Sequence, residues 1–172
     1  PLDSEADFEA LNIDVADNIL LLECRRYDPI HKQSIIEDIA NEVSQNEKSL
    51  VKIVENASNY VFSNFVYTKG ITNIFTTVDE ILSHKRGVCQ DFAHLLLQIL
   101  RTLQIPSRYV SGYICANADG MRGQGATHAW VEAYIPFHGW LGFDPTNNCI
   151  ASDRHVRLAI GRSFTDCTPV KG

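Results

Sequence analysis

The hydrophobic pattern of this chain changes its period once, at Pro106, and that change limits the folds the chain can adopt. Before Pro106, apolar residues recur three and four positions apart, as they do along one face of an α-helix. After it, apolar and polar residues alternate, as they do along half-buried β-strands. Because the helical part comes first and the strands follow, the pattern predicts an α+β fold with an antiparallel sheet.

Four helices are expected in the first part of the chain, over residues 33–43, 47–66, Val78–His84 and 89–103. Thr77 and Glu80 have the spacing of a capping box, which opens the third of them. Gly87 interrupts the chain before the fourth helix, whose apolar side chains cover much of its circumference. That distribution predicts a deeply buried helix.

Four strands are expected after Pro106, over residues 107–116, Thr127–Ile135, 140–143 and 155–160. A polar, glycine-rich loop, residues 117–125, separates the first two. Residues 136–139 have the composition of a hairpin turn between the second and third strands.

Residues 1–30 fit neither pattern clearly, and we expect an irregular lead-in there, with Ile19–Cys24 as a short strand or buried tether. The chain starts without Met, and its acidic first residues are unlike a signal peptide. We therefore expect a fragment of a longer protein.

Charge and cysteine usage exclude several classes of protein. The net charge of −6 disfavours a nucleic-acid binder, which would present a basic face. No apolar run approaches the ~20 residues that span a bilayer, so no membrane interaction is expected. Five cysteines at irregular spacing suggest neither a disulfide framework nor a zinc site. Free thiols fit a reducing compartment, and a cytoplasmic location is the expectation.

Cys89 opens the buried helix directly after Gly87 and Val88. Unpaired backbone N–H groups and the positive end of the helix dipole stabilise a thiolate at such a position. The same N–H groups can donate to an oxyanion on an attacked carbonyl. The alternative is a small buried residue at a helix start, which is common for free cysteines.

His128 and Asp144 lie in the two strands that the predicted hairpin joins. If the turn closes, the end of the second strand returns towards the start of the first, and Asp144 falls within a few residues of being opposite His128. The register, which the sequence leaves open, decides whether the two side chains share a face of the sheet. A thiolate nucleophile, an imidazole base and an orienting carboxylate form one catalytic set. Alternatively, His128 is an ordinary histidine, and Asp144, which precedes Pro145, is a turn residue.

The motifs around these residues resemble those of the bacterial transglutaminase-like superfamily. They are Gly87-Val-Cys89-Gln-Asp-Phe-Ala-His94, Ile105-Pro-Ser-Arg-Tyr-Val-Ser-Gly-Tyr113, Thr127-His-Ala-Trp-Val-Glu132 and Gly139-Trp-Leu-Gly-Phe-Asp-Pro-Thr-Asn147. The resemblance implies a papain-like core, with Cys89 as nucleophile, His128 as general base and acid, and Asp144 as orienter. It also implies a catalytic domain over residues 31–172, preceded in the parent protein by a separate domain. No cofactor and no metal are implied.

Neighbouring residues are weaker candidates. Gln90 is a possible oxyanion donor, and Tyr113 and Trp130 are either substrate-cleft residues or core aromatics. Asp91 suits a structural role in the first helical turn, and Glu132 is expected to bind an arginine, for which Arg108 is the candidate.

The expected chemistry is acyl transfer through a thioester, with a peptide or protein as the substrate. If water accepts the acyl group the protein is a cysteine protease or amidase, which we favour. If an amine accepts it, the protein is a transglutaminase. The remaining alternative is a non-catalytic binding or scaffold module. The sequence gives no prediction of oligomeric state.

Overall fold

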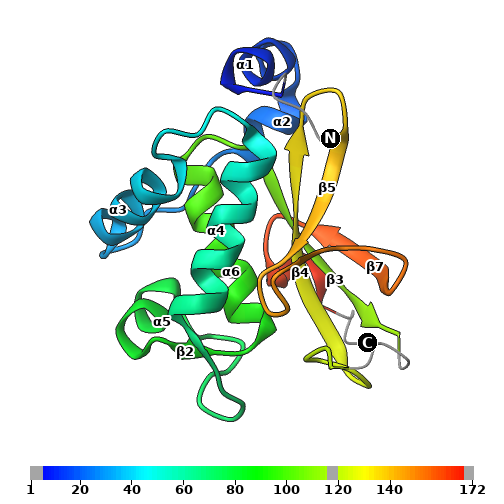
Figure 1. The fold of residues 1–172 in the computed structure, drawn as a ribbon. Coiled ribbons are helices and arrows are strands. Elements are labelled where there is room, and N and C mark those ends of the chain that lie inside the picture. Colours follow the sequence, from blue (N-terminus) through cyan, green and yellow to red (C-terminus); the bar gives the residue numbers. More distant parts are fainter. Residues whose placement is uncertain (1–5, 116–119, 169–172) are drawn as a thin grey trace.

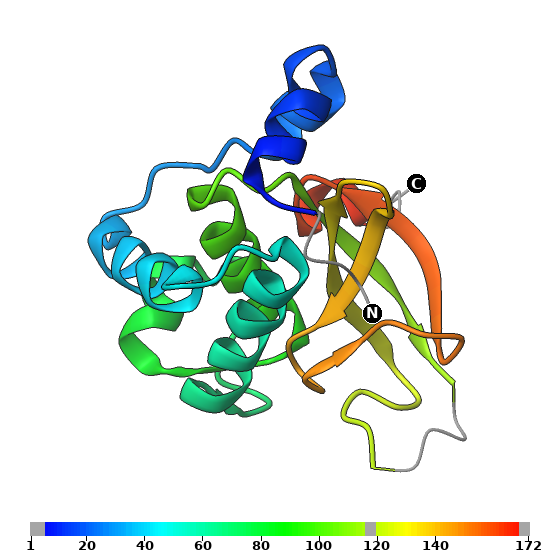
Figure 2. The ribbon, with the colours of Figure 1, turned by 45° about the horizontal axis from the view of Figure 1, so that its top comes forward.

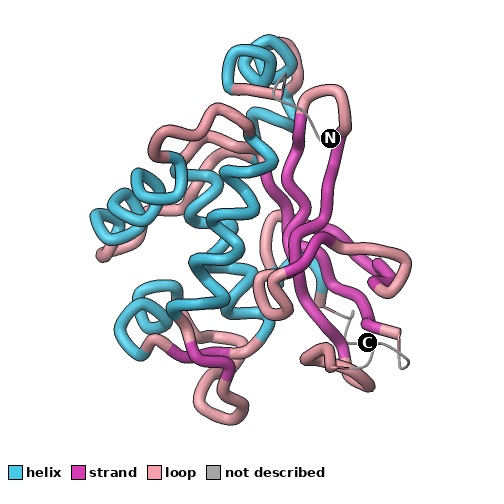
Figure 3. The backbone as a smooth tube through the Cα atoms, viewed as in Figure 1, coloured by secondary structure: helices cyan, strands magenta, loops and turns pink. Residues whose placement is uncertain are grey.

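The protein has a layer of helices on one side and a sheet on the other (Figure 1). The computed structural model describes residues 6–115 and 120–168. Figure 3 shows the helices and strands separated in space, as they are along the chain. The α+β fold expected from the sequence is confirmed.

All four expected helices and all four expected strands are present. The helices are α3 (Gln33–Ser44), α4 (Leu50–Asn64), α5 (Val78–His84) and α6 (Cys89–Thr102). The strands are β3 (Ser107–Ile114), β4 (Thr127–Ile135), β5 (Gly139–Asp144) and β7 (His155–Gly161). The capping box of Thr77 and Glu80 is formed, so the signal that predicted α5 is the one that starts it.

The first 30 residues are a correction to the expectation, because they hold two helices rather than an irregular lead-in. These are α1 (Phe8–Ala16) and α2 (Ile19–Cys24). Side-chain oxygens of Asp7 and Asn18 accept hydrogen bonds from backbone N–H groups in the first turns of α1 and α2, as N-cap residues do. Figure 2 shows these helices at one end of the molecule, and the Tyr134 hydroxyl donates to Asp14 at 3.0 Å, which ties α1 to the sheet.

Four shorter elements were not anticipated. They are the strands β1 (Val66–Tyr67), β2 (Arg86–Gly87) and β6 (Cys149–Ile150), and the 3₁₀ helix η1 (Phe164–Cys167). β1 and β2 pair in parallel, with Tyr67 opposite Gly87. This pairing matters for the site, because it sets Tyr67 beside the segment that leads into Cys89.

Helix α6 lies at the centre of the core. It packs against α3 and α4 on one side and against β3 and β4 on the other. Its side chains Phe92, Leu95, Leu96 and Ile99 are fully buried, as its apolar circumference predicts. None of the helices in the described ranges is long and apolar enough to cross a membrane.

The five-stranded sheet has the order β6-β5-β4-β3-β7, and all its neighbouring strands are antiparallel. The expected hairpin joins β4 and β5, with Val131 opposite Phe143. That register brings Asp144, at the end of β5, back towards His128, at the start of β4. A bulge between Ser111 and Gly112 shifts the pairing of β3 with β7.

Candidate active site

Asp91 fixes the start of α6 through hydrogen bonds to the segments that precede it. Its Oδ2 accepts hydrogen bonds from the Val88 backbone N–H at 2.8 Å and from the Thr72 hydroxyl at 2.6 Å. A Cβ at Gly87 would lie 2.7 Å from the Asp91 side chain, so the chain preceding the helix must pass this carboxylate closely. Burial raises the pKa of Asp91. The structural role expected for Asp91 is confirmed. Asp91 fixes the position of the backbone at the start of α6, where Cys89 lies.

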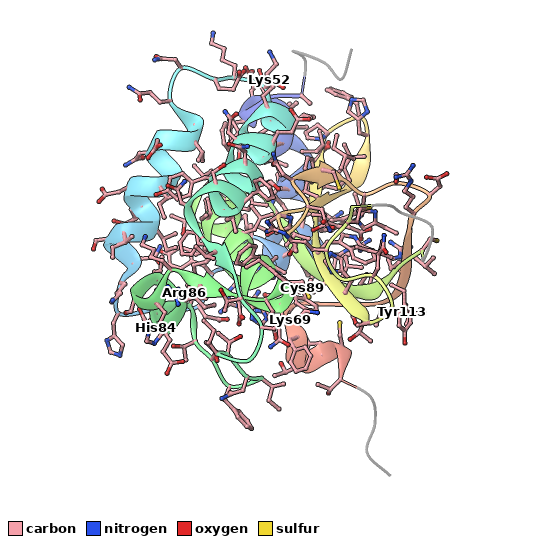
Figure 4. All side chains as sticks on the ribbon, turned by 60° about the horizontal axis from the view of Figure 1, so that its bottom comes forward. Lys52, Lys69, His84, Arg86, Cys89 and Tyr113 are labelled. Atoms are coloured by element: carbon pink, nitrogen blue, oxygen red, sulfur yellow. The ribbon has the colours of Figure 1, made fainter. Side chains whose placement is uncertain are left out.

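Cys89 is half-buried and is the first residue of α6. Backbone N–H groups in the first turn of a helix have no acceptor within the helix. Figure 4 shows Cys89 at the N-terminal end of α6, on the face turned to the viewer.

His128 and Asp144 form a fully buried pair. His128 Nε2 lies 2.8 Å from Asp144 Oδ2, and neither side chain is exposed to solvent. Burial lowers the pKa of His128, but the hydrogen bond to Asp144 and the interactions with Asp144 and Cys89 raise it by more, to about 9. Nδ1, the other ring nitrogen, makes no hydrogen bond of ordinary geometry in the described structure, and Cys89 is the neighbour that interacts with the ring. The fold thus brings the three candidate residues together.

Gly123, in the described part of the glycine-rich loop, lies close against His128. A Cβ at Gly123 would lie 2.5 Å from His128 Nδ1, and the backbone there is in the left-handed region, at φ +91°. Glycine is therefore the residue that lets the loop pass at this distance.

The Asp144 carboxylate receives five hydrogen bonds. Backbone N–H groups of Thr146 and Asn147 donate to Oδ1, at 3.0 and 3.2 Å. Oδ2 lies near His128 and His155 and also accepts from the Asn147 side-chain amide at 2.9 Å. Burial raises the pKa of Asp144, but the hydrogen bonds from the two histidines and Asn147, with the His128 charge, outweigh it and hold the pKa well below its usual range. Asp144 is therefore a permanently charged acceptor.

His155 is a site residue that sequence reasoning missed. Its Nε2 lies 2.9 Å from Asp144 Oδ2, and its side chain is 1% exposed. It opens β7, where the shifted register with β3 places it opposite Ile114. Only the position of a histidine at a strand start could have suggested it, since the bulge that sets the register leaves no signal in the sequence.

Trp130 lies beneath both histidines and is 2% exposed. Its ring centroid lies 6.3 Å from that of His128, stacked, and 5.1 Å from that of His155, edge-on. A Cβ at Gly112 would lie 2.6 Å from the ring and a Cβ at Gly142 3.3 Å from it, so both glycines make room for the indole. Trp130 is thus a core aromatic residue, the second of the two expected alternatives. Its ring contacts orient the imidazoles of His128 and His155.

The remaining candidates from the sequence are Glu132, Gln90 and Tyr113. Glu132 binds Arg108, as expected, with Arg108 Nε donating to it at 2.8 Å. Gln90 is half-buried in the first turn of α6, beside Cys89. Tyr113 is 43% exposed near the end of β3, opposite Thr127. Substrate roles for Gln90 and Tyr113 stay predictions.

Asn147 connects the glycine-rich loop to the buried carboxylate. It accepts from the Arg122 backbone N–H at 2.7 Å and donates to the Arg122 carbonyl at 3.1 Å, while its amide also reaches Asp144. The Arg122 guanidinium lies 5.3 Å from the ring centroid of Phe62 and 5.5 Å from that of Tyr67. Arg122 thus links the described part of the loop to Asn147 on one side and to Phe62 and Tyr67 on the other.

Tyr67 is the second residue that the sequence did not reveal. Its pKa is raised by burial and then by the charge of Cys89, which Arg122 partly offsets. The Tyr67 side chain is therefore close enough to Cys89 to interact with it electrostatically. Its place follows from the β1–β2 pairing, which is non-local.

Three of the buried side chains are of the types that bind metal ions. In the described part of the chain, His128, Asp144 and His155 form a group whose potential ligand atoms lie within 4.8 Å of one another. Both imidazole Nε2 atoms, however, lie within hydrogen-bond distance of the same carboxylate oxygen. This geometry suits a hydrogen-bonded network, in which a metal would have to replace both contacts.

Comparison with known proteins agrees with the geometry. The family model of the transglutaminase-like superfamily matches residues 37–145. An uncharacterised protein of Mycobacterium leprae is 34% identical over 155 residues, which cover 88% of this chain and 54% of that protein. The chain thus spans about half the length of that curated relative.

Solved structures show the same fold. A crystal structure reported as "a Putative Cysteine Protease from Cytophaga hutchinsonii" superposes with a TM-score of 0.73 at 27% identity, covering 88% of this chain and 50% of that one. The periplasmic domain of TgpA from Pseudomonas aeruginosa gives 0.59 at 28% identity, covering 75% and 47%. With the family model matching well over half of its length, the chain belongs to the transglutaminase-like superfamily.

Proposed function

We propose that this protein is a cysteine-nucleophile acyl-transfer enzyme that hydrolyses peptide or other amide bonds through a thioester. The observation that carries the proposal is the meeting of Cys89, at the start of α6, with the buried His128–Asp144 pair. A histidine whose pKa is raised by a carboxylate and a thiol suits an imidazolium paired with a thiolate.

The proposed reaction has two stages, acylation of Cys89 and hydrolysis of the thioester. The Cys89 thiol proton passes to His128, and Cys89 Sγ forms a bond to the amide carbonyl carbon. His128 then protonates the leaving nitrogen as the C–N bond breaks, which releases an amine and leaves a thioester on Cys89. Water attacks the thioester while His128 accepts a proton from it. As the C–S bond breaks, the carboxylic acid departs and His128 gives its proton to Cys89 Sγ, which restores the thiol.

We infer two candidate groups to stabilise the oxyanion formed at the carbonyl. One is the backbone N–H of Cys89, in the first turn of α6, which has no acceptor within the helix. The other is the hydroxyl of Tyr67, the residue that pairs with Gly87 and senses the charge of Cys89. Gln90 stays a further candidate donor.

An amine acceptor is the alternative to water. A Pseudomonas aeruginosa protein named protein-glutamine gamma-glutamyltransferase is 37% identical over 75 residues, which cover 40% of this chain and 11% of that protein. The thioester is common to both reactions, so the acceptor alone separates a hydrolase from a transglutaminase. The cytoplasmic location stays a prediction, and the periplasmic TgpA domain is a reason to test it.

A peptide-library assay tests the proposal. Wild type and Cys89→Ala are incubated with quenched fluorescent peptides, with and without a primary amine, and products are identified by mass. Cleavage that depends on Cys89 supports hydrolysis, and amine-containing products support transamidation. Cys115→Ala, which removes an exposed cysteine, is the matched control and should behave as wild type. The absence of products from wild type as well as from Cys89→Ala would leave the non-catalytic module as the explanation, and equal cleavage by both would exclude Cys89 as the nucleophile.

A further inference from the structure

Two imidazoles meet at one oxygen of the catalytic carboxylate. Oδ2 of Asp144 lies 2.8 Å from Nε2 of His128 and 2.9 Å from Nε2 of His155. A carboxylate can only accept hydrogen bonds, so both nitrogens must carry a hydrogen. A second buried imidazole on this oxygen adds a partner beyond the three residues that the reaction itself requires.

We propose that His155 is a positioning residue, which holds the Asp144 carboxylate in the orientation that receives His128. The inference rests on the proposed function, since the position being held is that of the general base. In the proposed reaction His155 takes part in no bond-making step, and it acts through Asp144.

The tautomer of His155 is set by its own turn. The backbone N–H of Ser152 donates to His155 Nδ1 at 3.3 Å, which leaves Nδ1 as the acceptor and places the hydrogen on Nε2. The His155 backbone N–H in turn donates to the Ser152 carbonyl at 3.0 Å. The ring is thus oriented by local hydrogen bonds before it meets Asp144, and its edge-on contact with Trp130 fixes its plane.

The effect on the carboxylate follows from where its donors lie. Backbone N–H groups hold Oδ1, whereas side chains alone hold Oδ2. Of those side chains, Asn147 also holds Arg122, and His128 is the residue whose orientation the carboxylate has to set. His155 is therefore the donor to Oδ2 that has no other part in the site.

A pair of substitutions separates donation from shape. His155→Phe keeps an aromatic ring against Trp130 but removes the donor, whereas His155→Gln places an amide N–H near the position of Nε2. We expect His155→Phe to lower kcat by about 10- to 150-fold, the factor for loss of one hydrogen bond to a charged group, with KM unchanged. His155→Gln should restore most of that loss. His138→Gln, at an exposed histidine in the β4–β5 turn, should leave kcat unchanged.

A second readout does not depend on substrate. The rate at which iodoacetamide alkylates Cys89 near neutral pH reports the thiolate–imidazolium pair. We expect this rate to fall in His155→Phe and to recover in His155→Gln, with circular dichroism confirming that both variants fold. Equal rates in all three proteins, or equal losses in both variants, would overturn the positioning role. If no amide substrate is found but the alkylation rates follow this order, the proposed reaction fails while the inference about His155 stands.

Discussion

Replacing Asp144 with Asn removes one charge and changes one oxygen to an NH₂ group, within a site built entirely of donors. If the new amide nitrogen takes the position of Oδ2, the three donors His128, His155 and the Asn147 side chain lose their acceptor. If it takes the position of Oδ1, only the backbone N–H groups of Thr146 and Asn147 lose theirs. We expect the second orientation, because fewer hydrogen bonds are lost. At about 1–3 kcal/mol for each buried group left unsatisfied, the free energy of unfolding should fall by about 2–6 kcal/mol.

The catalytic loss has a separate cause. Without the carboxylate charge, only Cys89 offsets the burial of His128, and the pKa of His128 should fall from about 9 towards the ordinary value of about 6.5. The imidazolium that pairs with Cys89 and protonates the leaving amine is then scarce at neutral pH. In a serine-protease triad the same substitution costs about 10⁴ in kcat, and we expect a loss on the order of 10³–10⁴ here.

The assay measures kcat from pH 5 to 10 together with urea denaturation of each variant. Asp79→Asn is the matched control, because the Asp79 carboxylate also accepts two backbone N–H bonds, from His31 and Lys32, but lies outside the site. Asp79→Asn should lower stability and leave kcat as it is. If Asp144→Asn turns over at the wild-type rate, Asp144 is not the orienter; if Asp79→Asn loses kcat equally, the loss reflects stability and not chemistry.

Four other perturbations have defined outcomes. A methyl group at Gly112 would stand 2.1 Å from a carbonyl oxygen of β7 and 2.6 Å from the Trp130 ring, so Gly112→Ala should cost about 3 kcal/mol or more, seen in urea denaturation. Gly123→Ala should displace His128 and lower kcat, with a smaller effect on the free energy of unfolding. An unchanged kcat would mean that Gly123 does not lie against His128 in solution. Tyr67→Phe should lower kcat by about 10²–10³ if its hydroxyl is an oxyanion donor, with KM little changed. Because the folded-state pKa of His128, about 9, is raised above the unfolded value of about 6.5, its contribution to stability is complete below pH 6.5 and is lost as the pH rises through 9. That contribution to the free energy of unfolding is at most about 3 kcal/mol. Urea denaturation at pH 6 to 10 should show this loss in wild type and not in His128→Gln.

The parts of the fold that were predictable are those with a local cause. The capping box of Thr77 and Glu80 marks α5, and strict alternation marks β4, whose bounds match the expectation. α1 was missed because it buries only Leu11 and Val15, which give too weak a periodic pattern to recognise. The two-residue strands exist only through their partners, which no local pattern reveals.

The site divides in the same way. Cys89, His128 and Asp144 could be proposed from a helix start, a hairpin and the motifs around them. His155 and Tyr67 could not, because each reaches the site through a pairing between distant segments, β3 with β7 and β1 with β2. Trp130 was recognisable as an aromatic near the base, but its burial depends on Gly112, in a neighbouring strand.

Formation of an acyl-enzyme is the most direct test of the central claim, that Cys89 is the nucleophile of an acyl-transfer enzyme. The protein is mixed with an activated ester such as p-nitrophenyl acetate, quenched in acid within seconds, and its mass measured intact and after digestion. We predict one acyl group per chain, on the peptide that contains Cys89, absent from Cys89→Ala and slow to form in Asp144→Asn. Acylation of the exposed Cys115 at the same rate, or an equal adduct on Cys89→Ala, would contradict the account.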